Sequence, residues 1–267
     1  LNDHRGDRIT ALLPGVMGIE GMVEAARILA PDWSLASVED VDFHAPLKFY
    51  RDEPRTIETS ALLHPDGADL IAECRIEAER QLPGSDTPTR TTHFTGRVRL
   101  TRDAPEGQHE DPPTREGAEI AADDVYRMYF HGPAYQVVEA AWRAGDRSAA
   151  QFAADLPANH SPDDQPTQAA PRLIELCFQA AGLWEAGRDG RLALPTHVTR
   201  AVVLGSAGEA AEGPLTVSAL QGTDGFDCVV TDASGAVAVR LEGYRTVALP
   251  QPLADDVQAP IRAVMTD

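Results

Sequence analysis

Each half of the chain offers one substantial helix among several strands, and this feature constrains the fold more than any other. Apolar residues at helical spacing predict helices over 16–29 and 172–186. Apolar runs bounded by turn residues predict strands over 37–50, 56–64, 70–81, 91–101, 135–143, 148–154, 196–204, 214–221, 227–232 and 236–250. A lone helix cannot cover both faces of a parallel sheet. We therefore expect each half to form an antiparallel sheet curled around its helix.

Two such units in one chain make a double hot dog, so we predict an α+β fold with two antiparallel sheets, each wrapped around one long helix. The stretch 102–122 is rich in Pro, Gly and acidic residues and has no periodic apolar pattern, which is typical of a solvated connection. We expect an N-terminal hot dog over 1–101, a linker over 102–122 and a C-terminal hot dog over 123–267.

The charge balance and composition disfavour several classes of partner and chemistry. Asp and Glu number 42 against 23 Lys and Arg, a net charge of −19, which disfavours binding to nucleic acid and to anionic membranes. No apolar run approaches the length of a membrane-spanning helix. Lys48 is the only lysine, which argues against Schiff-base chemistry and a Gly-Lys phosphate loop. No two histidines lie within one helical turn, so we do not expect a local metal site.

The cysteines indicate the compartment. Cys74, Cys177 and Cys228 are far apart in the chain and form no Cys-x-x-Cys pair. This usage favours reduced, buried thiols in a cytoplasmic protein. The chain begins abruptly at Leu1, and we expect it to be a piece of a longer, multifunctional polypeptide.

The first of three segments that can carry chemistry joins His4 to the run Leu-Leu-Pro-Gly-Val-Met-Gly-Ile-Glu at 12–20. A histidine ahead of a Pro-Gly helix start can lie near the helix N-terminus, whose free backbone N–H groups stabilise an oxyanion. Gly15, directly after Pro14, lets a substrate carbonyl approach the backbone closely. Histidine also suits proton transfer near neutral pH. The alternative is a frayed terminal residue before an ordinary helix start.

The second segment is Tyr-Phe-His-Gly-Pro-Ala-Tyr-Gln at 129–136. Gly132 and Pro133 form a stiff turn before Tyr135, which can hold this tyrosine against a binding channel. The alternative is a plain turn that leads into a strand.

The third segment is the predicted helix that carries Glu175 and Gln179. These residues are four apart, so their side chains meet on one helix face. Apolar neighbours are expected to desolvate Glu175 in part, and desolvation favours the protonated, proton-donating form of a carboxyl group. Gln179 can then orient the carboxyl. The alternative is a solvated Glu–Gln pair.

Taken in this order, the three segments resemble the dehydratase domain of polyketide synthases. The resemblance is closest to iterative synthases that make enediyne polyenes or resemble polyunsaturated fatty acid synthases, and it extends to Leu-Glu-Gly-Tyr-Arg at 241–245. It implies the double hot dog fold. Two departures stand out: the family usually spaces its motif His-x-x-x-Gly-x-x-x-x-Pro, about one residue shorter than His4 to Pro14, and its acid is usually Asp where Glu175 stands.

Carried over residue by residue, the resemblance implies that His4 is the catalytic base and Glu175 the catalytic acid. It also implies substrate contacts at the residues that match the binding motifs of the family, which are Pro14, Gly15, Gly132, Pro133, Tyr135 and Gln179.

The implied activity is that of a hydro-lyase, which eliminates water from a 3-hydroxyacyl thioester on an acyl carrier protein and leaves a 2-enoyl thioester. No cofactor is expected, because the phosphopantetheine arm belongs to the carrier protein. The implied partners are this carrier protein, other domains of the same synthase and a second copy of the chain in a homodimer. The alternatives are a catalytically silent hot dog that serves as a scaffold or dimerisation domain, a hot dog thioesterase and an enoyl isomerase.

Overall fold

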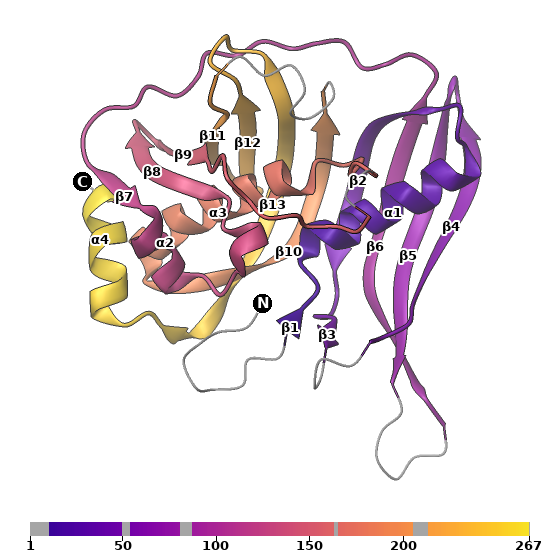
Figure 1. The fold of residues 1–267 in the computed structure, drawn as a ribbon, viewed down its shortest axis with the longest axis horizontal. Coiled ribbons are helices and arrows are strands. Elements are labelled where there is room, and N and C mark those ends of the chain that lie inside the picture. The colour runs from indigo at the N-terminus through magenta and orange to yellow at the C-terminus, as the bar shows by residue number, and fades with distance from the viewer. Residues whose placement is uncertain (1–10, 50–53, 81–86, 163–164, 205–212, 267) are drawn as a thin grey trace.

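A computed structural model describes residues 11–49, 54–80, 87–162, 165–204 and 213–266 (Figure 1). The elements of the first half are β1 (Ala11–Leu12), α1 (Gly15–Leu29), β2 (Ser34–Phe43), β3 (Lys48–Phe49), β4 (Ile57–Asp66), β5 (Asp69–Arg80) and β6 (Thr89–Thr101). The helix predicted in this half is therefore confirmed, and it begins directly after Pro14.

The second half contains three helices, one short 3₁₀ turn and seven strands among the described residues. They are β7 (Glu119–Ala121), α2 (Ala122–Met128), η2 (Pro133–Tyr135), β8 (Val138–Ala144), β9 (Arg147–Phe152), α3 (Pro171–Asp189), β10 (Arg191–Val203), β11 (Thr216–Gln221), β12 (Phe226–Thr231), β13 (Val237–Pro252) and α4 (Asp255–Met265). The sequence pattern predicted α3 but neither α2 nor α4.

The strands form one long antiparallel sheet rather than two separate ones. Eleven described strands follow the order β4-β5-β6-β2-β10-β13-β12-β11-β9-β8-β7, while β1 and β3 form a separate pair. The two halves join at β2 and β10, where Asp42 is opposite His197 and Val38 is opposite Ala201. Each half wraps its part of this sheet around one long helix (Figure 1). The predicted double hot dog is therefore confirmed, with its two sheets joined edge to edge.

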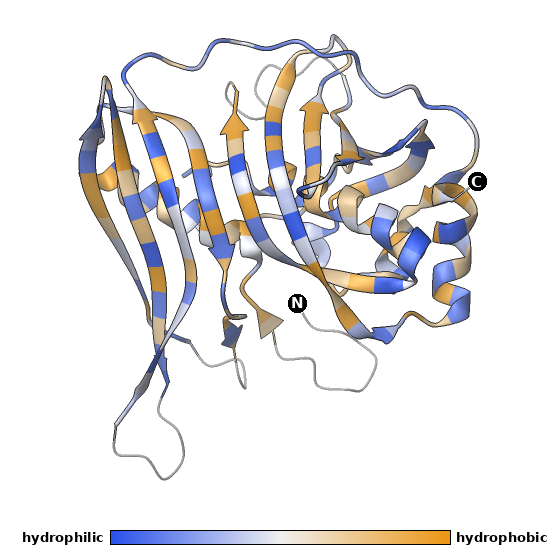
Figure 2. Cartoon of the chain, turned by 180° about the vertical axis from the view of Figure 1, so that it is seen from behind, coloured by the Kyte–Doolittle hydropathy of each residue, from blue (hydrophilic) through white to orange (hydrophobic). Residues whose placement is uncertain are grey.

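In the first half, the sheet buries one face and exposes the other. Along β5, Cys74 and Ile76 are buried, whereas their neighbours Glu73 and Arg75 are exposed. Figure 2 shows this alternation as hydrophilic and hydrophobic bands along the strands. Burial raises the pKa of the Cys74 thiol to about 12, so that it stays protonated at neutral pH.

The two long helices differ in how completely they are buried. On α1, Ile19, Met22, Val23 and Ala26 form an apolar stripe that faces the sheet. On α3 nearly every residue is buried, because the helix contacts strands of the second half on one side and α1 and α4 on others. A helix that is buried on all sides tolerates few polar residues, and Glu175 is one of the few on α3.

The stretch 102–122, expected to be a solvated linker, is fixed along the second half. Trp142 donates a hydrogen bond from Nε1 to the Thr114 carbonyl at 2.9 Å, and His109 forms a β-bridge with Ala236. The stretch ends in β7, the edge strand of the sheet. The boundaries of the two domains stay a prediction. None of the described helices has the length and apolar character that crossing a membrane requires.

Candidate active site

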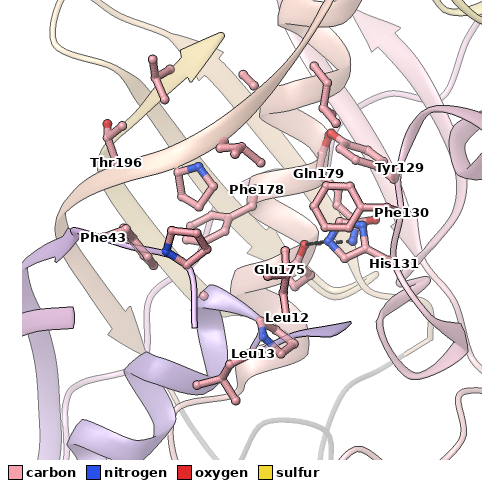
Figure 3. A pocket seen from close by; sticks show the side chains of 18 of the residues that line it. Leu12, Leu13, Phe43, Tyr129, Phe130, His131, Glu175, Phe178, Gln179 and Thr196 are labelled. Carbon is pink, nitrogen blue, oxygen red and sulfur yellow. Dashed lines mark hydrogen bonds and ion pairs between the residues drawn. The ribbon is translucent and has the colours of Figure 1, made fainter. Parts of the chain in front are cut away.

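A cavity of about 400 Å³ lies where the two halves meet, between the start of α1, α3 and the strand β10. Its walls are mostly apolar and include Leu12, Phe43, Phe130, Phe178 and Leu194. Polar groups reach it at few points, and Glu175, His131 and Gln179 lie together on one side of it (Figure 3). A mostly apolar pocket with a few convergent polar groups is the usual form of a small-molecule site.

Glu175 lies near the start of α3 and is only 5% exposed. Its Oε1 accepts a hydrogen bond from Gln179 Nε2 at 3.0 Å and lies 3.0 Å from His131 Nε2. The predicted meeting of Glu175 and Gln179 on one helix face is present, and the pair is buried rather than solvated.

Gln179 has its amide orientation set by three neighbours. Its Nε2 donates to the Tyr135 carbonyl at 2.9 Å as well as to Glu175, and its Oε1 accepts from the Tyr126 hydroxyl at 2.9 Å. The Tyr126 oxygen in turn accepts from the backbone N–H of Val138 at 2.7 Å. An amide with both donors and its acceptor engaged has one orientation, so Gln179 presents an N–H to Glu175.

Two tyrosines beside this network act as neutral hydroxyl donors. Burial raises the pKa of both Tyr126 and Tyr129, and the nearby Glu175 adds to both shifts. Tyr129 donates to the backbone carbonyl of Gln179 at 2.8 Å. Both phenols therefore stay protonated across the physiological pH range.

His131 is held by aromatic neighbours on two sides. Its ring stacks on Phe130 with centroids 5.4 Å apart and an interplanar angle of 9°, and it meets Tyr129 edge-on at 5.3 Å. Its carbonyl accepts from Gln136 Nε2 at 3.1 Å. Its Nδ1 is buried and has no hydrogen-bond partner among the described residues.

The start of α1 forms another part of the cavity wall. Pro14 and Gly15 both line it, and no side chain caps the helix N-terminus. The first N–H groups of a helix have no partner within the helix, so they are available to an oxygen in the cavity. A Cβ on Gly15 would lie 2.8 Å from Phe43 Cε1, which explains why glycine fits here.

The remaining predicted residues have different placements. Gly132, Pro133 and Tyr135 are absent from the described lining of the cavity. Tyr135 instead lies behind Gln179, where its hydroxyl accepts from Asn159 Nδ2 at 3.3 Å. This placement differs from the expected contact with a channel, because Pro133–Tyr135 forms a 3₁₀ turn rather than the start of a strand. His4 lies outside the described residues.

Three residues of this network were not predicted from the sequence: His131, Tyr126 and Tyr129. His131 lies inside the segment that was singled out, directly before Gly132, so a titratable group next to the turn was the available signal. His131 lies between α2 and η2, whereas Glu175 lies on α3, so no local spacing in the sequence indicates their contact. Within the described residues, no group of three or more His, Cys, Asp or Glu is arranged to hold a metal ion.

Comparisons with known proteins agree with this architecture. The chain is 30% identical over 200 residues to polyketide synthase GfsB of Streptomyces halstedii, a match that covers 70% of this chain and 3% of that protein. Among solved structures, the dehydratase domain from the CurF module of curacin polyketide synthase has a TM-score of 0.70 at 18% identity, covering 90% of this chain and 86% of that one. A trans-AT polyketide synthase dehydratase domain from Brevibacillus brevis has a TM-score of 0.69 at 19% identity, covering 90% and 86%.

A family model supplies the assignment. Residues 99–255, more than half of the chain, match the model described as polyketide synthase dehydratase N-terminal domain. The chain therefore belongs to the polyketide synthase dehydratase family.

Proposed function

We propose that this chain eliminates water from a 3-hydroxyacyl thioester on an acyl carrier protein and releases a 2-enoyl thioester. One observation carries the proposal: a buried carboxyl group, Glu175, is fixed by hydrogen bonds on the wall of a mostly apolar cavity that the N-terminus of α1 also lines. Membership of the dehydratase family supports the same reaction class.

The reaction needs a proton removed at one carbon and a proton delivered at its neighbour. The thioester carbonyl accepts a hydrogen bond from a backbone N–H near Gly15, which stabilises the enolate-like oxygen. His4, assigned from the family motif, takes the α-proton. As the C–O bond breaks, Glu175 gives its proton to the β-hydroxyl, which leaves as water, and the electron pair of the C–H bond becomes the new double bond. Each positioned acid or base contributes about 10²–10⁴-fold.

The partners follow from the substrate. We propose that the phosphopantetheine arm of the carrier protein brings the acyl chain, so that the protein itself needs no organic cofactor or metal. Tethering raises the local substrate concentration, so weak docking suffices. We further propose that the chain works in the cytoplasm beside other domains of an iterative synthase of the enediyne or polyunsaturated type, as a homodimer.

The test uses a synthetic 3-hydroxyacyl thioester and follows the formation of the conjugated enoyl product. We expect elimination by the wild type and its loss in His4→Ala and in Glu175→Gln. Glu73→Gln, at an exposed position on β5, is the matched control and keeps full activity. Product analysis separates the alternatives: free acid and thiol indicate a thioesterase, a shifted alkene without loss of water indicates an isomerase, and no product above background indicates a scaffold.

A further inference from the structure

We propose that His131 is a positioning residue that directs the acidic proton of Glu175 onto Oε2, the oxygen open to the cavity. The inference rests on the proposed function, because it concerns how Glu175 delivers a proton. It adds a residue to which neither the family resemblance nor the sequence motifs gave a role.

The two oxygens of Glu175 have different surroundings. Oε1 meets both polar neighbours, Gln179 Nε2 at 3.0 Å and His131 Nε2 at 3.0 Å (Figure 3). Oε2 has no hydrogen-bond partner among the described residues. It is also not fully enclosed by protein atoms. Since Glu175 lines the cavity, Oε2 is the oxygen that a substrate hydroxyl reaches.

The unpartnered nitrogen of His131 indicates which ring nitrogen carries the proton. A buried N–H without an acceptor is more costly than a buried lone pair without a donor. Because Nδ1 is buried and lacks a partner, the neutral ring places its hydrogen on Nε2. His131 therefore donates to Glu175 Oε1, as Gln179 does.

Two donors on Oε1 determine where the acidic hydrogen lies. A carbonyl oxygen has two lone pairs, and the amide of Gln179 and the ring of His131 occupy both. The acidic hydrogen of Glu175 must therefore lie on Oε2. Once that proton has passed to the leaving hydroxyl, the same two donors stabilise the carboxylate, and hydrogen bonds to an ionised group are stronger than neutral ones. His131 thus assists the step in which Glu175 loses its proton.

The ring is built to keep this orientation. Phe130 stacks on one face of the His131 ring, and the Tyr129 ring packs against it in a T-shaped contact. The side chain of His131 is only 14% exposed, so water competes little for Nε2. A donor held in advance costs no reorganisation during the reaction.

Three substitutions at His131 provide the test, with elimination on the synthetic thioester as the assay. Glutamine places its amide N–H close to the position of Nε2, asparagine places it close to Nδ1, and leucine has no donor. We expect kcat to fall about 10- to 100-fold in His131→Leu and His131→Asn, the effect of losing one hydrogen bond to a charged group. His131→Gln retains most of kcat. KM changes little in all three, because the lost interaction strengthens mainly in the transition state.

His64→Leu is the control, since His64 lies on β4 with its side chain 44% exposed, outside the cavity. Thermal unfolding of each variant shows that it is folded. Wild-type activity in His131→Leu, or equal rates for the asparagine and glutamine variants, overturns the inference and leaves the proposed function intact. Absence of elimination by the wild type overturns the proposed function itself.

A second measurement does not depend on turnover. Nitrogen NMR of the ring distinguishes a protonated nitrogen from a bare one, and His131→Gln identifies the signals. We expect Nε2 of His131 to carry the hydrogen and Nδ1 to be bare at neutral pH. A neutral ring with its hydrogen on Nδ1 overturns the inference, because Nε2 then accepts from Glu175 and the acidic proton lies on Oε1.

Discussion

Replacing Gly182 by alanine tests the packing that supports the carboxyl group. Gly182 is buried on α3, and a Cβ at this position would lie 2.3 Å from the hydroxyl oxygen of Tyr129. That hydroxyl donates to the Gln179 carbonyl at 2.8 Å. Alanine improves helix propensity by about 1 kcal/mol. Overpacking costs about 1–3 kcal/mol, and disrupting a buried hydrogen bond costs about 1–3 kcal/mol more. The net destabilisation is therefore about 1–5 kcal/mol.

Thermal unfolding measures this difference. An unfolding entropy of about 2.1 cal/mol/K per residue gives roughly 0.56 kcal/mol/K for 267 residues, so Tm falls by about 2–9 °C in Gly182→Ala. Gly21→Ala on α1 is the matched control, because the nearest atom to its added Cβ is Ile76 Cδ1 at an ordinary 3.5 Å. The propensity gain then acts alone, and Tm rises by about 1–2 °C.

A double variant identifies the clash. Without its hydroxyl, the ring of Tyr129 presents Cζ at 3.4 Å to the new Cβ at Gly182, which is close to an ordinary contact. In a Tyr129→Phe background, Gly182→Ala should therefore lower the free energy of unfolding by less than it does in the wild type. A double-mutant cycle should show this coupling. A Gly182→Ala protein as stable as the wild type, or additive costs in the cycle, would refute the reasoning.

Two further predictions concern charged groups away from the cavity. The oxygens of Glu20, buried on α1, accept hydrogen bonds from the backbone N–H groups of Gln168 and Ala169 at 2.6 and 2.8 Å. In Glu20→Gln, the side-chain NH₂ group faces one of these two N–H donors, so calorimetry should show a loss of about 1–3 kcal/mol in the free energy of unfolding. An unchanged stability contradicts this. Burial opposes ionisation of Glu39, but hydrogen bonds led by that from Arg99 outweigh it and lower the Glu39 pKa. A lowered pKa stabilises the fold above the unfolded value of about 4.3, and this stability is lost as the pH falls through the lower folded value. Urea unfolding should show Arg99→Met destabilised at pH 7, with the difference from the wild type shrinking in acid; a constant difference contradicts this.

Local sequence patterns predicted the elements that position the site but not all of the contacts between them. The start of α1 after Pro14 and the pairing of Glu175 with Gln179 depend on spacings within one helix, so the sequence indicates both. The contact of His131 with Glu175 joins two elements across 44 positions, and only the packing of the second half brings them together. The helix α4 was not predicted, because Pro260 interrupts its helical pattern of apolar residues.

The cavity itself depends on both halves, which explains why neither half suggests it alone. Four aromatic rings cross the seam in order: Phe94 contacts Phe43 at 5.9 Å, Phe43 contacts Phe178 at 6.0 Å, and Phe178 stacks on Tyr244 at 4.1 Å. The first two rings lie on strands of the first half, and the last two on α3 and β13 of the second. Because Gly15 packs directly beneath Phe43, this row of rings fixes the start of α1 relative to the helix that carries the carboxyl group. The distance between the first N–H groups of α1 and the Glu175 carboxyl is thus set by packing between the halves, which a short sequence motif cannot encode.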